Sequence, residues 1–406
     1  MAVNCKPLPH LYPVPGIRLG TAAASIKKPG RRDLVVMAID TGANCAAVFT
    51  QNAFCAAPVT LARNHLAQAA PRYLLINTGN ANAGTGAQGL HDAATCCSAL
   101  AQLAHCRSDE VLPFSTGVIG EPLPVDKIVQ GLPDAYATLS DTGWEDAAHG
   151  IMTTDTVPKG VARKIDIAGH TVTVTGIAKG SGMIRPDMAT MLAFIATDAG
   201  VQQEVLQQCL RVAVQSSFNR ITVDGDTSTN DACVLIATGK STLARIDHVA
   251  HPAYRILCDA ITQVCSELAQ LIVRDGEGAT KFITLRVSGG ASEQECNDVA
   301  YTIAHSPLVK TAFFASDPNW GRILAAVGRA GIADLDLARI TLHLDDACIV
   351  RDGGRAPGYE EKLGQDIMCK NEITIHVDLA RGPHASTVWT CDFSYDYVRI
   401  NAEYRT

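Results

Sequence analysis

The hydrophobic and polar positions in the first third of the chain predict strands that alternate with a helix. Short apolar runs at residues 33–40, 45–50 and 73–77 are typical of buried strands. The segment HDAATCCSALAQLAHC at 91–106 has apolar residues at three- and four-residue steps, which predicts a helix. Glycine and asparagine fill the connection TGNANAGTGAQG at 78–89, which predicts a loop between strand and helix.

The middle of the chain predicts a hairpin and two long helices. The segment KIDIAGHTVTVTGIAKG at 164–180 alternates polar and apolar residues around Gly169-His170, as a β-hairpin does. Helices are predicted at about 201–217 and 251–273. In the second helix the apolar residues from Ile256 to Ile272 form one broad stripe, which indicates a buried face.

The sequence changes character after VSGGAS, and we place a domain boundary near residue 286. Residues 286–406 then form a smaller α+β unit behind a main unit of residues 1–285. Its predicted elements are two helices followed by three strands: 297–313, 319–330, 339–344, 372–379 and 386–398. Because strands outnumber complete strand–helix–strand units, the pattern favours α+β layers over a doubly wound parallel sheet.

The composition fits a globular protein that does not bind nucleic acid. Hydrophobic residues make up 47% of the 406 residues and charged residues 18%, which suffices for two or three domains or one large layered domain. The net charge of -7 argues against nucleic acid or an anionic membrane surface as a partner. No apolar run approaches the roughly 20 residues of a membrane span. Prolines interrupt the amino-terminal segment, which does not resemble a signal peptide, so we expect a cytoplasmic protein.

The common cofactor and metal motifs are absent from the sequence. The fourteen cysteines show no CxxC spacing, and most, including adjacent Cys96 and Cys97, are expected to be small buried hydrophobic residues. Residues 84–89 satisfy GxGxxG, but TGNANA separates them from the preceding strand and no acidic residue follows at the usual distance. A glycine-rich loop before a helix is therefore favoured over dinucleotide binding. We expect neither a metal nor a bound cofactor.

The stretch KGSGMIRPDMATMLAF, residues 179–194, offers a candidate nucleophile in Thr190. A threonine hydroxyl needs a base beside it, and its own α-amine, with a pKa of about 8, could serve if the bond after Ala189 were cut. Small Ala189 and the glycines at 180 and 182 suit a strained peptide that cuts itself. The alternative is that Thr190 is only the first residue of a buried strand. Local chemistry leaves both readings open.

The segment PFSTGVIGEP at 113–122 offers donors for an oxyanion. Thr116-Gly117 puts a hydroxyl beside a backbone amide that no side chain shields, which is what a tetrahedral intermediate of acyl transfer requires. The same two residues also fit a turn after a strand, so this segment alone does not decide between the two.

Several blocks of the sequence resemble the ornithine acetyltransferase family of arginine biosynthesis, also called glutamate N-acetyltransferases. They cover nearly the whole chain in the family's order, which makes the resemblance specific. The blocks are NTGNANAGTG (77–86), STGVIGEPLP (115–124), IMTTDTVPK (151–159), KGSGMIRPDMATMLAF (179–194), VDGDTSTND (223–231), DGEGATK (275–281), SDPNWGRILAAVGRAG (316–331) and NAEYRT (401–406).

The resemblance implies a chain that cleaves itself between Ala189 and Thr190. Residues 1–189 would form an α fragment, and the β fragment would begin at Thr190. The implied fold is an α/β/β/α sandwich made of 1–189 and 190–285, with a smaller α+β unit at 286–406 whose tail returns to the active site. The fragments would pair, commonly as a heterotetramer of two α and two β. Ser181, Arg185 and Asp187 stand where relatives often carry other residues, and we expect them to tune the cleavage loop without removing the chemistry.

The resemblance also implies a role for each site residue. Thr190 is the nucleophile, and Thr116 and Gly117 form the oxyanion hole. The substrate pocket comprises six residues: Thr153, Lys179, Thr190, Glu277, Asn401 and Thr406. Lys179 can hold a carboxylate and Glu277 an ammonium group, although both would otherwise be read as surface charges. Thr153 is preferred to its neighbour Thr154.

The implied activity is acetyl transfer from N-acetylornithine to glutamate through an ester on Thr190. Use of acetyl-CoA as a further donor is left open by the sequence. One rival function is a related self-cleaving amidohydrolase or aminopeptidase, in which water accepts the acyl group from the same nucleophile. The other rival is a non-enzymatic or cofactor-binding protein in which Thr190 belongs to the core.

Overall fold

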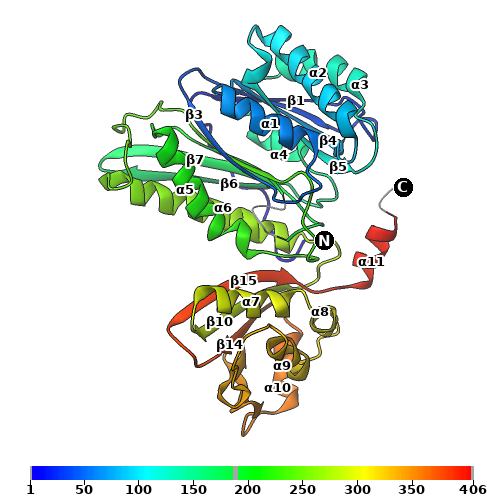
Figure 1. Ribbon diagram of the computed structural model, residues 1–406, viewed down its shortest axis with the longest axis vertical. Coiled ribbons are helices and arrows are strands. Elements are labelled where there is room, and N and C mark those ends of the chain that lie inside the picture. Colours follow the sequence, from blue (N-terminus) through cyan, green and yellow to red (C-terminus); the bar gives the residue numbers. More distant parts are fainter. Residues whose placement is uncertain (1, 186–190, 404–406) are drawn as a thin grey trace. The chain divides into compact units, whose positions relative to one another are not determined.

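The computed structural model describes residues 2–185 and 191–403, which form two compact units (Figure 1). The larger unit comprises Lys6–Asn219 and Asp226–Ile272, and the smaller unit comprises Met1–Cys5, Arg220–Gly225 and Val273–Thr406. The expected boundary near 286 falls inside a strand of the smaller unit, β10 (Phe282–Gly290), because the unit already begins at Val273.

The larger unit contains two sheets. The first has the order β1-β2-β4-β5 and is antiparallel except for the parallel pair β4–β5; its strands are Ile17–Ala22, Leu34–Ile39, Tyr73–Asn80 and Val111–Val118. The second has the order β3-β9-β8-β7-β6 and is antiparallel except for the parallel pair β8–β9; its strands are Asn44–Phe49, Ala232–Ala237, Leu192–Thr197, His170–Lys179 and Lys159–Ile167.

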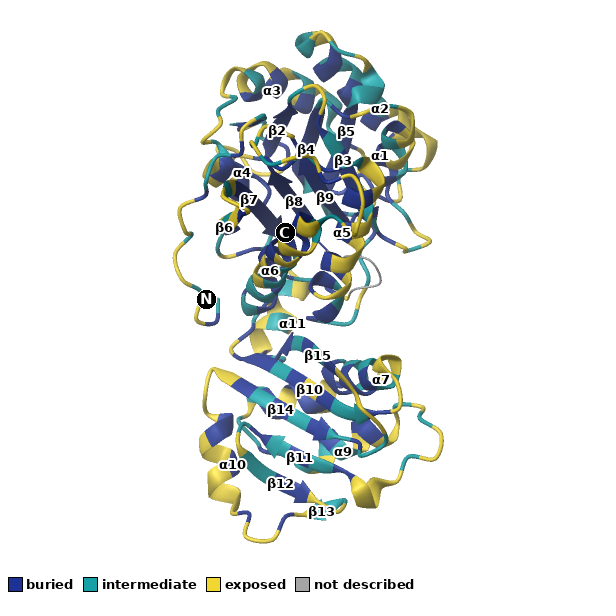
Figure 2. Ribbon diagram, turned by 90° about the vertical axis from the view of Figure 1, so that its left-hand side faces the viewer, coloured by how far each residue is buried: buried dark blue, intermediate teal, exposed yellow. Residues whose placement is uncertain are grey.

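The two sheets pack face to face through a buried apolar core. Alternate residues of each strand enter this core, such as Met37 and Phe114 from the first sheet and Phe194 from the second. Phe114 and Phe194 meet edge to face with ring centroids 5.2 Å apart. Most of the strand residues accordingly appear dark blue, whereas the helices carry many teal and yellow residues (Figure 2).

Helices cover the outer face of each sheet. The opposite residues of the first sheet, such as Val36 and Leu75, pack with α2 (Gly86–Ala104) and α3 (Val125–Ala137). On the second sheet, α5 (Gln203–Gln215) contacts β3 and α6 (Pro252–Arg274) lies close to Gly176 through Val264 and Leu268. The main unit is therefore a mixed α+β fold with α/β/β/α layers, which confirms the expected class. Two further helices are α1 (Ala57–Gln68) and α4 (Trp144–Gly150).

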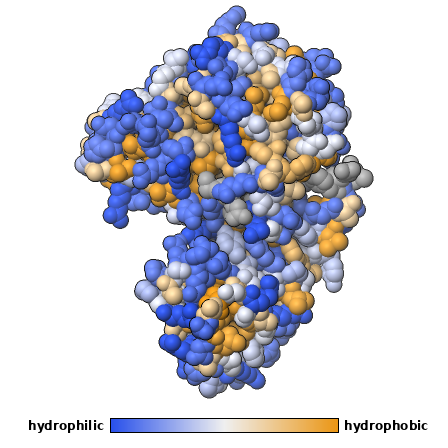
Figure 3. Space-filling view, in the orientation of Figure 1, coloured by the Kyte–Doolittle hydropathy of each residue, from blue (hydrophilic) through white to orange (hydrophobic). Residues whose placement is uncertain are grey.

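Helix α6 is the one described helix that is long and apolar enough to cross a membrane, and 56% of its most apolar window is buried. Its buried residues include Leu257, Ile261, Val264 and Leu268, which belong to the apolar stripe predicted from the sequence. A core helix of this kind passes the same hydropathy test as a membrane span. Elsewhere, hydrophobic residues appear on the surface as separate patches among hydrophilic ones (Figure 3).

The smaller unit is built on one mixed sheet of order β13-β12-β11-β14-β10-β15. Besides β10, its strands are Gly354–Arg355, Ala347–Arg351, Thr341–Leu344, Glu372–Asp378 and His384–Cys391. Its helices are α7 (Glu293–Ala304), α8 (Pro307–Phe314), α9 (Trp320–Gly328), α10 (Glu361–Met368) and α11 (Tyr395–Ala402). Short 3₁₀ helices lie at Ser108–Glu110 in the larger unit, at Phe218–Arg220, where the chain passes between the units, and at Leu337–Arg339 in the smaller unit.

Most predicted elements are confirmed within a few residues, but two predictions in the smaller unit are wrong. The single helix expected at 297–313 is two helices, because the Ser306 side chain accepts a hydrogen bond from the Val309 amide and Pro307 starts a new helix. The strand expected at 386–398 ends at Cys391. There Ser394 caps α11, so the end of the described chain is helical.

The hairpin and the buried cysteines are confirmed. Strands β6 and β7 pair around Ala168 and Gly169, both at positive φ, so the turn lies one residue earlier than expected. Cys96 and Cys97 are buried in the core beneath α2. A dinucleotide site needs a helix that begins directly after the strand. Here β4 ends at Asn80 and α2 begins at Gly86, so residues 81–85 separate the two elements.

Candidate active site

Strand β5 presents the predicted oxyanion pair next to the end of its parallel neighbour β4. Thr116 is 9% exposed, and Gly117 has a φ of +139°. A side chain at Gly117 would overlap the backbone of Gly79 and lie 2.5 Å from the Asn80 nitrogen, so only glycine fits this close approach. The Thr116-Gly117 step is thus a tightly packed strand end and not a loose turn.

Lys179 brings the second sheet to this pair. It is the last residue of β7 and is only 8% exposed. Its Nζ donates a hydrogen bond to Thr116 Oγ1 at 3.3 Å. A predicted substrate-binding cation and a predicted oxyanion residue, 63 positions apart in the sequence, therefore touch. A desolvated ammonium group in this position attracts a negative charge more strongly than it would in water.

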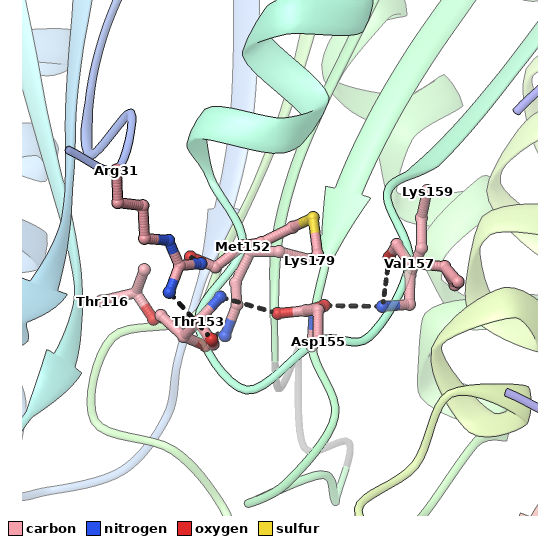
Figure 4. Close-up of polar contacts among 9 residues, drawn as sticks. Arg31, Thr116, Met152, Thr153, Asp155, Val157, Lys159 and Lys179 are labelled. Carbon is pink, nitrogen blue, oxygen red and sulfur yellow. Dashed lines mark hydrogen bonds and ion pairs between the residues drawn. The ribbon is translucent and has the colours of Figure 1, made fainter. Parts of the chain in front are cut away.

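Asp155 fixes the loop that carries Thr153 (Figure 4). Its carboxylate accepts the Thr153 backbone N–H at 2.9 Å, the Lys159 Nζ at 2.6 Å and the Gly180 N–H at 2.8 Å. Both side chains of the Asp155–Lys159 ion pair are fully buried. Through these bonds one carboxylate sets the backbone on both sides of the site, next to Thr153 and next to Lys179.

Arg31 holds the same loop from its other side. Its guanidinium donates to the Met152 carbonyl at 2.5 Å and to the Thr153 carbonyl at 3.2 Å. Thr153 is consequently fixed through both its N–H and its C=O. The choice between Thr153 and Thr154 as a substrate contact stays a prediction.

Two buried carboxyl groups near Lys179 have pKa values shifted in opposite directions. Burial alone would raise the pKa of Asp155, but the charges of Lys159 and Lys179 hold it well below its usual value. Burial raises the pKa of Asp231 well above its usual value, and the Ser228 hydrogen bond and the Lys179 charge offset this only partly. Asp155 is therefore held in its charged form by the two lysines, whereas burial favours the neutral form of Asp231. Environments that push two carboxyl groups apart in this way are typical of catalytic sites.

The smaller unit places two further predicted residues together. Asn401, on α11, donates to Glu277 Oε2 at 2.9 Å, and Glu277 is only 6% exposed. The turn that carries Glu277 binds the start of α11, since Ser394 Oγ donates to the Gly278 carbonyl at 2.6 Å. The carboxy-terminal segment therefore folds onto the DGEGATK block of its own unit.

Three residues central to the sequence-based reading lie outside the described residues: Ala189, Thr190 and Thr406. Asp187 is likewise outside, whereas Ser181 is buried and Arg185 is exposed. Their predicted roles stay predictions. Among the described residues, no group of three or more histidine, cysteine, aspartate or glutamate side chains is arranged to hold a metal ion.

Sequence reasoning missed the residues that support the predicted ones. Asp155, Lys159, Asn230 and Asp231 all lie inside blocks quoted for the family resemblance, IMTTDTVPK and VDGDTSTND. Their polar and charged side chains in short, otherwise loop-like segments were the available signal. Only burial and contact distances show what these side chains do.

The fold and the site define a layered α/β/β/α protein with a buried lysine–threonine contact between its two sheets. The chain belongs to the ArgJ family, whose model matches residues 18–406. Two curated relatives, each named arginine biosynthesis bifunctional protein ArgJ, come from Pseudomonas fluorescens (strain Pf0-1) and Pseudomonas syringae pv. tomato (strain ATCC BAA-871 / DC3000). Each is 58% identical over 406 residues, with both chains fully covered. These findings confirm the resemblance drawn from the sequence blocks.

Solved structures of similar proteins include arginine biosynthesis bifunctional protein ArgJ from Bacillus halodurans. It is 38% identical with a TM-score of 0.48, and the match covers 50% of this chain and 95% of that chain. An ornithine acetyltransferase complexed with ornithine, from Mycobacterium tuberculosis, is 34% identical with a TM-score of 0.38; here the coverage is 44% of this chain and 94% of that chain.

Proposed function

We propose that this chain is a self-cleaving acetyltransferase of arginine biosynthesis. It moves the acetyl group of N-acetylornithine to glutamate through an ester on Thr190. The observation that carries the proposal is the contact of Lys179 Nζ with Thr116 Oγ1 in a chain that belongs to the ArgJ family. The names of the relatives, arginine biosynthesis protein and ornithine acetyltransferase, support the same pathway and substrate.

Scission of the chain creates the catalytic base. The Thr190 hydroxyl attacks the Ala189 carbonyl, the amide becomes an ester, and water opens the ester to leave a free α-amine on Thr190. Strand β8 begins two residues later, and its first residue, Leu192, pairs with Lys179. This pairing supports the proposal, because the strand that follows Thr190 in the sequence begins beside the buried cation. The freed amine is a suitable base because its pKa lies near physiological pH.

Acetyl transfer then proceeds in two displacements. Thr190 Oγ attacks the acetyl carbonyl of N-acetylornithine while its amine takes the hydroxyl proton. Thr116 Oγ1 and the Gly117 N–H donate to the oxyanion, and Lys179 adds positive charge beside Thr116. The ornithine nitrogen leaves with the proton. The amine of glutamate next attacks the acetyl ester, which yields N-acetylglutamate and restores the hydroxyl.

Substrate recognition uses charged side chains that the family resemblance assigns to the pocket. Lys179 is the partner proposed for the substrate carboxylate and Glu277 for an ammonium group. The assignment of Thr153, Asn401 and Thr406 rests on the family resemblance. The proposed reaction uses no resident metal or cofactor, and acetyl-CoA is a second donor to be tested. We further propose that two α and two β fragments assemble in the cytoplasm.

Product analysis separates transfer from hydrolysis. Purified protein given N-acetylornithine and glutamate should form N-acetylglutamate and ornithine in equal amounts, with little acetate. Acetate in excess of acetylglutamate would overturn transfer in favour of the related amidohydrolase, which shares the nucleophile but uses water. Replacing N-acetylornithine with acetyl-CoA in the same assay tests the second donor. Nuclear magnetic resonance of the acetyl methyl group distinguishes all of these products.

We expect the Gly117→Ala variant to lose turnover. The new methyl group would overlap the Gly79 backbone, so β5 must shift at the oxyanion hole. Loss of one such donor typically costs about 100- to 1,000-fold in turnover. The matched control is Gly120→Ala, because Gly120 also has positive φ (+83°) but has open space around it. That variant should keep turnover within about threefold and lose about 1 kcal/mol of stability. Wild-type turnover by Gly117→Ala would contradict the assigned oxyanion hole.

A further inference from the structure

Asn230 is a buried amide that the proposed mechanism does not use. It is 6% exposed and lies in the VDGDTSTND block, two residues before β9. Its Nδ2 donates to the Ser115 carbonyl at 3.0 Å and to the Ala81 carbonyl at 2.6 Å. The orientation of the amide is determined, because both neighbours of Nδ2 are pure acceptors and Oδ1 accepts from Thr229 Oγ1 at 2.5 Å.

These bonds join the two sheets at the strand ends. Ser115 belongs to β5 and immediately precedes the proposed oxyanion pair, whereas Asn230 leads into β9. Strand β9 is the parallel neighbour of β8, and the Ala232 N–H donates to the Met191 carbonyl at 2.9 Å. The Asn230 side chain thus connects β5, which carries the proposed oxyanion donors, with the start of β9. Strand β9 in turn neighbours β8, which follows the proposed nucleophile.

The bond to Ser115 fixes the peptide that orients Thr116. The carbonyl of residue 115 and the N–H of residue 116 belong to one rigid plane. Holding that plane limits the direction of the Thr116 side chain and of the next amide, Gly117. A second hydrogen bond holds the same residue, because Ser115 Oγ donates to Asn77 Oδ1 at 2.6 Å. Oxyanion donors stabilise a transition state only when they are held in place beforehand.

The segment that carries Asn230 is itself anchored to the connection between β3 and α1. The Thr50 N–H donates to the Asp231 carbonyl at 3.0 Å, and Thr50 Oγ1 donates to the Ser228 carbonyl at 2.7 Å. The Ala56 N–H donates to the Thr229 carbonyl at 3.0 Å. Because the backbone is fixed on both sides of Asn230, its side chain is held rigidly. Positioning of a catalytic peptide requires such a rigid support.

We infer that Asn230 is a positioning residue that holds the Ser115–Thr116 peptide, and through it the oxyanion donors, in the reactive geometry. This inference rests on the proposed function of Thr116 and Gly117. Asn230 acts on the acetyl-transfer transition state and not on the binding of the substrate. Its removal should therefore lower kcat and leave KM nearly unchanged.

The test uses Asn230→Ala, Asn230→Asp and the control Asn52→Ala. Asn52 Nδ2 donates to the Thr227 carbonyl at 2.9 Å, so the control removes an amide–carbonyl bond to the same loop without touching β5. Turnover is expressed per molecule of cleaved protein, and intact-mass spectrometry measures the cleaved fraction. Asn230→Ala should lower kcat by about 10- to 100-fold with KM within about twofold. The control should keep kcat within about twofold.

Asn230→Asp supplies a signature that a purely structural residue would not give. A carboxylate facing two carbonyl oxygens repels both, whereas the protonated acid can donate to one of them. Burial raises the pKa of a carboxyl group, so the ratio of kcat in Asn230→Asp to kcat in wild type should rise at least about threefold as the pH falls from 8 to 6. The same ratio for Asn230→Ala should stay flat. Equal flat ratios would overturn the inference.

The other outcomes are also decisive. Wild-type kcat in folded Asn230→Ala contradicts the inference, while wild type that forms no acetylglutamate overturns the proposed function instead. A folded variant that is never cleaved would place Asn230 in chain scission and contradict the assignment. Loss of soluble protein in both variants would show a structural role and would also contradict it.

Discussion

Replacing Thr190 with alanine should leave one chain of 406 residues where the wild type gives two fragments. The expected fragments are residues 1–189 and 190–406 of the sequence. Without the hydroxyl no ester can form at Ala189, so the peptide bond persists. Acetyl transfer should fall by at least about 10,000-fold, because both the nucleophile and the base that scission releases are lost. Intact-mass spectrometry and the acetyl-transfer assay measure the two effects separately.

Two control variants make this result specific to Thr190. Thr190→Ser keeps a hydroxyl and should still be cleaved. Ser181→Ala removes another hydroxyl of the same segment, one that is 1% exposed, and should be cleaved as fully as the wild type. Cleavage of Thr190→Ala at the same bond would show that another group cuts the chain. An active wild type that is never cleaved would refute the freed amine as the base.

The elements that were predicted correctly are those whose signal is local. The hairpin of β6 and β7 follows from strict alternation, and α6 follows from a stripe sustained over its 23 residues. The wrong predictions come from single residues that outweigh the pattern. Ser306 and Ser394 each cap a new helix, and in both cases the apolar spacing on either side gave no sign of the break.

The sheet order could not be predicted because it depends on contacts between distant segments. Strand β9, a run of six buried residues, pairs with β3 on one side and with β8 on the other. Such a short apolar run fits several neighbours equally well. The layering was expected from the family resemblance, and the pairings that create it are visible only in the structure.

The sequence predicted reactive residues of the site but missed the residues that hold them in place. Thr116 and Lys179 were named from motifs, and the structure brings them into contact. Asp155 and Asp231 are the same residue type in similar polar segments, yet the pKa of Asp155 is lowered and the pKa of Asp231 is raised. That difference arises from burial and from the distance to lysines, which no sequence pattern encodes.

Asp155→Asn should strongly destabilise the larger unit. The variant removes the carboxylate from the fully buried ion pair with Lys159, and breaking such a pair costs about 3 to 5 kcal/mol. At about 2 to 4 °C per kcal/mol for a unit of this size, the melting temperature should fall by roughly 6 to 20 °C. Differential scanning calorimetry at pH 7 measures this. The exposed Arg32–Asp146 pair provides the control, since Asp146→Asn should shift the melting temperature by less than about 4 °C.

The pH dependence and a double variant test the cause of that loss. Because the pKa of folded Asp155 is lowered, its stabilisation is present above the unfolded value of about 4 and disappears as the pH falls below it. The gap in melting temperature between wild type and Asp155→Asn should hold from pH 8 to 5 and narrow at lower pH. Adding Lys159→Met removes the buried positive charge and should recover at least about half of the lost stability. A double variant as unstable as Asp155→Asn alone would instead assign the loss to the bonds with Thr153 and Gly180.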